Sequence, residues 1–263
     1  MAENPYAAPR SHVEDAPTSL PDGDFIPEGR GVPTGNGWRW IADAWAFTGQ
    51  QRGTFIGVFL LWLLLAIVLG IIPILGSVLS ALLMPVISAG FILGCDAVRR
   101  GEKLEVGHLF AGFQNHAGKL ITVGAITLAF FIVMMLIVFA IFGSTIGFLV
   151  IGGGGDANPE QLMSAMASVL LAVLVMMALS IPLYMALWFA GPLIVLAQSD
   201  VVPALKTSFF ACLKNILPFL IWGIAIFFLS ILAFIPLMLG WLLLGPVVLA
   251  SIYISYRDIF HEV

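Results

Sequence analysis

Four long stretches without an acidic or basic residue constrain this chain more than any other feature of its sequence. They run over 53–95, 120–155, 161–199 and 215–256, and they are 43, 36, 39 and 42 residues long. A helix crosses the apolar core of a bilayer in about 20 residues. The chain is 60% hydrophobic and 10% charged, whereas a soluble domain is usually about a quarter charged. The sequence therefore predicts an all-α membrane protein and argues against a soluble enzyme.

The number of predicted spans is six. Prolines and glycines at 73–76 and 236–240 divide the first and last stretches into two spans each. Each middle stretch holds one span, because two would leave about 18 residues apiece with no room for a turn. The six predicted spans lie near 54–72, 77–98, 120–142, 162–198, 217–235 and 241–257.

The fourth predicted span is longer than a bilayer requires. At 1.5 Å per residue it would extend about 55 Å, against an apolar core of about 30 Å. We expect it to bend at Pro182 and Pro192. Its first turns, from Leu162 to about Ser168, are then expected outside the membrane.

The basic residues fix an expected orientation. All nine that follow residue 37 fall on one side of the six-span arrangement, and the loop 143–161 on the other side has none. Basic residues mark the cytoplasmic side of a membrane protein. The sequence therefore predicts a bacterial inner-membrane protein with both termini in the cytoplasm. The nine are Arg39, Arg52, Arg99, Arg100, Lys103, Lys119, Lys206, Lys214 and Arg257.

Residues 1–36 differ in composition from the membrane domain 37–263. They contain six prolines, and six acidic residues against two arginines. A segment with few large apolar side chains cannot bury enough surface to offset its ordering entropy. We expect a disordered acidic cytoplasmic arm, with a docking peptide for a cytoplasmic partner as the alternative.

A short sequence window occurs three times, before the first, third and fifth spans. The pairs Trp45-Ala46, Phe110-Ala111 and Phe210-Ala211 align without gaps, and an isoleucine follows each aromatic residue at eleven positions. In each window the apolar residues and the charged residues fall on opposite faces of a helix, which is typical of a helix lying in the membrane interface. The sequence thus predicts three repeats, each an interfacial amphipathic helix followed by paired spans.

Two of these windows carry a resemblance to a known family. The segments Gly37-Trp38-Arg39-Trp40-Ile41 and Ala211-Cys212-Leu213-Lys214-Asn215-Ile216-Leu217-Pro218-Phe219 resemble uncharacterised bacterial multi-pass inner-membrane proteins. That family is similar to the YciC-type proteins and to the membrane domain of some glycerophosphodiesterases. The resemblance implies the membrane fold and no activity, since the catalytic domain of those phosphodiesterases has no counterpart in this chain.

The acids nearest the membrane are expected to serve structure. Asp96, Asp200 and Asp258 follow the second, fourth and sixth spans, and a carboxylate at a helix C-terminus opposes the helix dipole. We expect ion pairs with Arg99, Lys206 and Arg257 that hold the interfacial helices to the span ends. The alternative is a polar site for a lipid headgroup or a metal.

Other candidate sites have ordinary structural interpretations. His108 and His116 are eight residues apart, whereas metal-binding pairs on helices are three or four apart, so we expect no metal and no cofactor. Cys95 and Cys212 are expected to be free thiols on the reducing side of the membrane. Small residues four apart predict close helix packing, within the chain or in a dimer: Gly90/Gly94, Ala186/Ala190 and Ser251/Ser255.

The sequence leaves three functions open. No charged residue lies in the middle of a span, which argues against a transporter that uses a buried carboxylate. We expect a non-enzymatic scaffold or accessory protein that binds membrane lipids, other membrane proteins or itself, and no nucleic acid. The first alternative is a transporter or flippase for a neutral or lipidic substrate. A lipid-modifying enzyme would need at least two of four residues within hydrogen-bond reach, namely Asp96, Asp200, His108 and His116.

Overall fold

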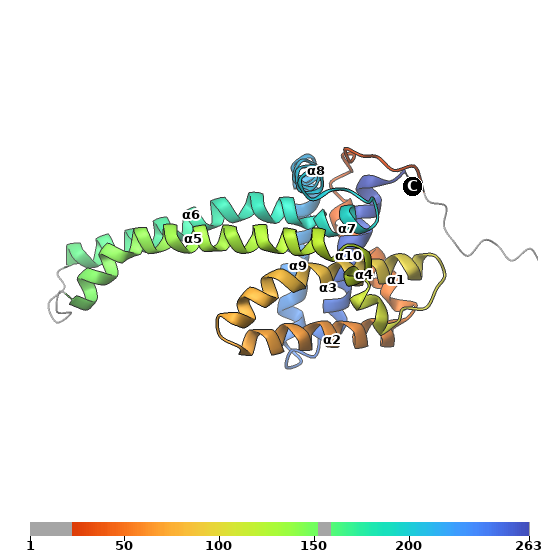
Figure 1. The fold of residues 1–263 in the computed structure, drawn as a ribbon, viewed down its shortest axis with the longest axis horizontal. Helices are drawn as coiled ribbons and strands as arrows, with labels where there is room; N and C mark the ends of the chain where they lie inside the picture. The colour runs from red at the N-terminus through yellow and green to blue at the C-terminus, as the bar shows by residue number, and fades with distance from the viewer. Residues whose placement is uncertain (1–22, 152–158, 263) are drawn as a thin grey trace, which may run out of the picture.

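The computed structural model describes residues 23–151 and 159–262, and these residues form helices and no strand. Two of the eleven elements, η1 and α4, are short (Figure 1). In chain order the elements are α1 (Asn36–Gly49), α2 (Arg52–Ile71), α3 (Leu75–Arg99), the 3-10 helix η1 (Val106–Phe110), α4 (Gly112–Asn115), α5 (Ala117–Ile151), α6 (Pro159–Trp188), α7 (Ala190–Val195), α8 (Val201–Lys214), α9 (Ile216–Phe234) and α10 (Trp241–Phe260).

Six segments are long and apolar enough to cross a membrane, which confirms the predicted all-α, six-span class. The fourth combines α6 and α7 as Met163–Val195. The third predicted span, 120–142, matches the membrane-spanning segment Ala117–Ala140, while the helix α5 itself continues to Ile151 because no proline or charge interrupts it before Gly152. Its 35 residues extend about 52 Å, well beyond the thickness of an apolar core.

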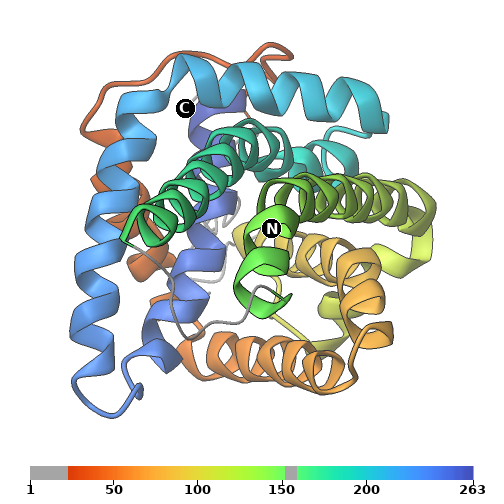
Figure 2. The same cartoon turned by 90° about the vertical axis from the view of Figure 1, so that its left-hand side faces the viewer.

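Consecutive spans form three antiparallel hairpins that point in different directions. In Figure 1 the α5–α6 pair runs across the view, whereas α9 and α10 run nearly at right angles to it. Figure 2 shows α5 and α6 close to end-on while α9 stands upright. The spans therefore diverge from a shared end instead of forming one parallel bundle.

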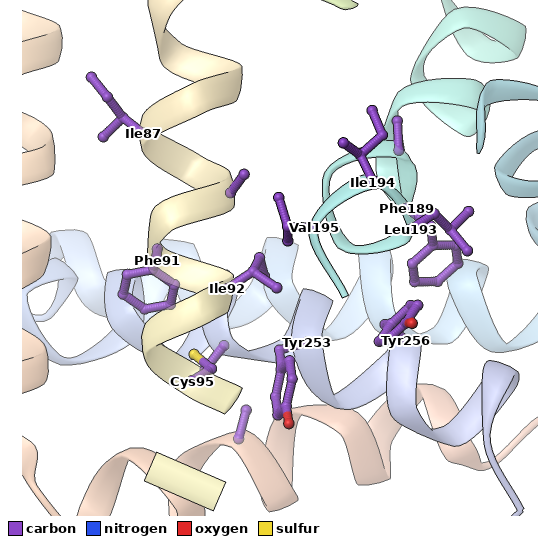
Figure 3. Close-up of a cluster of buried hydrophobic side chains, with 14 of the residues drawn as sticks. Ile87, Phe91, Ile92, Cys95, Phe189, Leu193, Ile194, Val195, Tyr253 and Tyr256 are labelled. Atoms are coloured by element: carbon purple, nitrogen blue, oxygen red, sulfur yellow. The ribbon is translucent and has the colours of Figure 1, made fainter. Parts of the chain in front are cut away.

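The hydrophobic core lies where the hairpins converge. Side chains from α3, α7 and α10 face one another there, including Ile92, Val195 and Tyr253 (Figure 3). Away from this end the spans are exposed: only 6% of the most apolar window is buried in Met163–Val195, and 17% in Arg52–Ile71. Packing inside the protein is thus concentrated at one end of the spans.

The three repeated windows pack against this convergent end in a closed order. The helix α1 contacts α9 and α10, the pair η1 and α4 contacts α3, and α8 contacts α6 and α7. Each window therefore lies on the hairpin that precedes it in the chain, and the first window lies on the last hairpin. The interpretation of the three units as copies of one repeat stays a prediction.

The second window does not form the continuous amphipathic helix that its spacing predicts. It is divided into η1 and α4. Two glycines, Gly107 and Gly112, weaken a helix here. A Cβ atom on Gly112 would overlap the carbonyl oxygen of Val86, so this backbone lies directly on α3.

The fourth span is interrupted at Phe189, and the helix continues through Pro182, where we expected a bend. Pro192 has no N–H to donate to the carbonyl of Trp188. In addition, the Ser208 hydroxyl accepts a hydrogen bond from the Phe189 N–H at 2.9 Å and donates to the Met185 carbonyl at 2.7 Å. A side chain of α8 thus replaces a helical hydrogen bond.

The predicted disorder of the arm is wrong for residues 24–36, which are bound to the body of the protein. The N–H groups of Ile26 and Arg30 donate to the carbonyls of Phe260 and Ile259 at 2.8 and 2.9 Å. These partners lie at the other end of the chain, so the amino-acid composition of the arm could not indicate them. Residues 1–22 lie outside the described residues.

Close packing at Gly90 gives a first prediction. A Cβ atom there would overlap the Leu109 carbonyl oxygen and lie 2.7 Å from the His108 carbonyl oxygen, so η1 touches the backbone of α3. Gly90→Ala should destabilise the protein by about 1–3 kcal/mol through overpacking. Thermal unfolding in detergent measures this. Gly57→Ala is the control, because nothing lies within 4 Å of that position; equal melting temperatures for both variants would contradict the packing.

Candidate functional site

A cleft of about 960 Å³ lies beside the core. Its walls come from residues 23–36 of the arm, from α1 and from the last turns of α3 and α10, which the fold brings together at the convergent end. Seven charged residues line it, four arginines and three acids: Arg30, Arg39, Arg99, Arg257, Asp43, Asp258 and Glu262.

Asp258 joins three of these walls. Its Oδ2 atom accepts hydrogen bonds from Asn36 Nδ2 and Trp40 Nε1, both at 2.7 Å. Its Oδ1 atom pairs with Arg30 Nη2 at 3.3 Å, and Arg30 Nε donates to the Asp258 carbonyl at 2.8 Å. The carboxylate at the end of α10 therefore holds both the arm and α1, and its ion pair is with Arg30, whereas Arg257 was the predicted partner.

Asp96 has a similar role between α3 and α10. The Tyr253 hydroxyl donates to Asp96 Oδ1 at 2.9 Å, and Arg99 pairs with the same oxygen at 3.2 Å. Arg99 Nε also donates to the Tyr253 oxygen at 2.9 Å. Arg100 reaches Asp96 Oδ2 at 3.4 Å. The predicted pair with Arg99 is confirmed, and the ion pair extends to a buried tyrosine of another span.

Asp200 is different from the other two acids. It is the N-cap residue of α8 and lies beyond the end of α7, so it does not oppose a helix dipole as predicted. Its carboxylate pairs with Lys119 at 2.7 Å and its side chain is 78% exposed. The hydrogen bond and charge of Lys119 lower the pKa of Asp200. The predicted partner Lys206 was wrong, because six residues further along a helix it lies on another side.

The arm is also held by the junction between α8 and α9. The side chain of Asn215 is buried; it accepts a hydrogen bond from the Val32 N–H at 2.8 Å and donates to the Arg30 carbonyl at 2.9 Å. Lys214 Nζ lies 3.2 Å from the carbonyl oxygens of Glu28 and Gly29. No local sequence pattern indicates these contacts, since they join residues about 185 positions apart.

Three of the four residues expected of a lipid-modifying enzyme, Asp96, Asp200 and His108, have other partners. Asp96 and Asp200 are bonded as described above, and His108 Nδ1 accepts the Glu105 N–H at 3.0 Å. No group of three His, Cys, Asp or Glu side chains within 23–151 and 159–262 is arranged to hold a metal ion. Cys95 and Cys212 are free and buried, and burial raises the pKa of the Cys212 thiol to about 12.

The partly buried carboxylate of Asp258 and the exposed one of Asp200 give a second prediction. Asp258→Ala leaves the Trp40 and Asn36 donors without their acceptor, which costs about 2–3 kcal/mol for a hydrogen-bonded charge. We expect a lower melting temperature in detergent and earlier proteolysis between Arg30 and Asn36. Asp200→Ala is the matched control, because an exposed ion pair contributes little. A loss as large in the control would show that the Asp258 network does not hold the arm.

Comparison with known proteins identifies a relative among bacterial inner-membrane proteins. No family model matches the chain, and no solved structure matches it. A probable inner membrane protein of Burkholderia thailandensis, BTH_II0599, is 30% identical over 210 residues, covering 76% of this chain and 75% of the relative. Together with the six membrane-spanning segments, this places the protein in an inner membrane. The chain belongs to the same family of bacterial inner-membrane proteins as this Burkholderia relative.

Proposed function

We propose that this protein is a non-enzymatic scaffold or accessory protein of the inner membrane that binds lipids or other membrane proteins. The observation that carries the proposal is the uneven packing of the spans. Their core lies at one end, while the remaining apolar surface of the hairpins faces outward. The narrower similarity to YciC-type proteins and to phosphodiesterase membrane domains stays a prediction.

The outward surface must be covered by lipid chains or by other membrane helices. The buried share of the most apolar window is 6% in Met163–Val195, 11% in Ile216–Phe234 and 17% in Ala117–Ala140. Lipid chains are as apolar as leucine, so no hydrophobic force drives these hairpins together in a bilayer. A rigid end with three separate hairpins suits a protein that arranges neighbouring components of the membrane.

The cleft and the core are proposed to face the cytoplasm, together with both termini. The nine basic residues of the membrane domain belong to α1, to α8, to the ends of spans near the core, or to the loop between α3 and η1. The opposite hairpin turns at 72–75 and 235–240 carry no base. This distribution agrees with the rule that basic residues stay on the cytoplasmic side.

The position of the cleft favours a scaffold over a transporter. A transporter for a neutral or lipidic substrate needs a passage between its spans near the middle of the membrane. The cleft instead lies at the charged ends of α3 and α10, next to Arg99 and Asp258. Its lining extends to the arm and α1, and it does not follow the apolar parts of the hairpins.

Cysteine labelling in sealed cells tests the orientation. Both native cysteines are buried, so the full chain has a low labelling background. An impermeant maleimide should label Ile74→Cys and Leu237→Cys, which lie at exposed hairpin turns, and should spare Lys103→Cys and Lys206→Cys. The opposite pattern would overturn the topology. Labelling of all four after lysis controls for accessibility.

Lipid exchange between bilayer leaflets tests the function. The full-length protein, reconstituted into vesicles of phosphatidylglycerol and phosphatidylethanolamine, should leave the flip rate of fluorescent phospholipids equal to that of protein-free vesicles. Native mass spectrometry of gently extracted protein should detect retained phospholipid or a membrane-protein partner. Accelerated flipping, or protein that retains neither, would contradict a scaffold.

A further inference from the structure

We propose that the cleft between α1, α3 and α10 binds the phosphate group of an anionic phospholipid at the membrane surface. This inference deepens the proposed scaffold function and rests on it. The argument uses the charges that line the cleft, the groups that already have partners, and the aromatic residues that place α1 at the interface.

Two carboxylates near the cleft are already neutralised. Both oxygens of Asp258 accept hydrogen bonds or an ion pair from the arm and α1. Both oxygens of Asp96, beneath the cleft, pair with arginines. In contrast, Arg39 takes part in no hydrogen bond or ion pair within the described part of the chain, although it lines the cleft. The guanidinium of Arg39 is therefore available to a ligand.

The charge of the lining sets the charge of the ligand. Four arginines and three acids line the cleft, but Asp258 is paired with Arg30, and Asp96, which is outside the lining, is paired with Arg99. The guanidinium of Arg39 offers one positive charge, which a phosphodiester with a single negative charge matches. Asp43 lies one helical turn from Arg39 and also lines the cleft, so it repels a ligand with several negative charges. A phosphodiester headgroup fits these conditions better than a nucleotide or a polyphosphate does.

Aromatic residues place the cleft at headgroup depth. Trp38 and Trp45, on the same helix as Arg39, are 54% and 44% exposed, and tryptophan favours the membrane–water interface. The Arg52 guanidinium lies 4.8 Å from the centre of the Trp45 ring. A helix that sets its tryptophans in the interface holds its other face, which carries Arg39 and Asp43, beside the lipid headgroups.

The walls of the cleft also suit the uncharged parts of a lipid. Phe47, Val98 and Ile254 line it beside the arginines. Its volume of about 960 Å³ is at the upper end of the range for small-molecule sites, which is about 300–1,000 Å³. The phosphate can therefore meet Arg39 while the glycerol and the first chain carbons contact the apolar wall.

The test is a titration of the full-length protein in detergent with dioleoyl phosphatidylglycerol, followed by native mass spectrometry. Arg39→Gln should weaken binding of the tightest lipid about tenfold, because it removes a charge-assisted contact to phosphate. Asp43→Asn should strengthen binding severalfold by removing repulsion, a gain that misfolding cannot produce. Lys206→Gln, an equal loss of charge outside the cleft, should stay within twofold of wild type.

Competing ligands identify the source of the phosphate. Dioleoylglycerol, which lacks phosphate, should not displace the bound lipid, and glycerol 3-phosphate should compete only at far higher concentration. Displacement by inorganic phosphate or glycerol 3-phosphate at lipid-like concentrations would overturn a lipid site. So would equal losses in Arg39→Gln and Lys206→Gln, or weaker binding in Asp43→Asn. Such results with an unchanged flip rate would reject the site and leave the scaffold function standing.

Discussion

The hydrogen bonds of the Asp258 carboxylate determine how the two ends of this chain meet. Asn36 and Trp40 bring α1 to the end of α10, and Arg30 brings the arm. Because α10 is the span with the largest buried share, 56% of its most apolar window, a group fixed to its end is fixed to the core. The walls of the cleft follow from this attachment, since the arm, α1 and α10 provide most of them.

A tryptophan–serine hydrogen bond joins the two helices of the first hairpin and of the third, where hydrophobic packing is weak. In the first hairpin Trp62 Nε1 lies 3.3 Å from the Ser88 hydroxyl, and in the third Trp222 Nε1 lies 3.0 Å from the Ser251 hydroxyl. Apolar side chains gain little by leaving lipid for one another, whereas a polar group in lipid needs a partner. The α5–α6 hairpin extends furthest from the core (Figure 1). Its outer surface therefore depends most on surrounding lipid or protein.

Local composition was enough to predict the spans but not their arrangement. Stretches without charge reveal where a chain can enter lipid, and all six predicted spans have a counterpart in the structure. The ends and breaks of helices were predicted less well. The helix α5 extends to Ile151, and the fourth span breaks at Phe189, where the side chain of Ser208 from α8 replaces a helical hydrogen bond. That contact joins residues 19 positions apart in the sequence, and the pattern of apolar residues within either helix does not predict it.

The cleft was harder to predict, because its residues come from distant parts of the chain. The three acids were predicted to be clamps from their positions at the ends of the spans, and Arg99 was predicted as the partner of Asp96 because it is the nearest base. Arg30, Asn36 and Tyr253 were missed as partners, since 228 residues separate Arg30 from Asp258. The arm was also misjudged for residues 24–36, whose few apolar side chains hid the fact that their backbone bonds to Phe260 and Asn215.

The dependence of the cleft on both chain ends links lipid binding to assembly. Arg39 faces the cleft only when α1 lies on α10, and the arm closes it only when Asn215 holds the backbone of Arg30 and Val32. A ligand that binds the assembled state and not the separated one stabilises the assembled state by mass action. A phospholipid in the cleft would therefore hold the first and last hairpins together at the membrane surface. In that arrangement the lipid acts as a structural component of the scaffold rather than as its cargo.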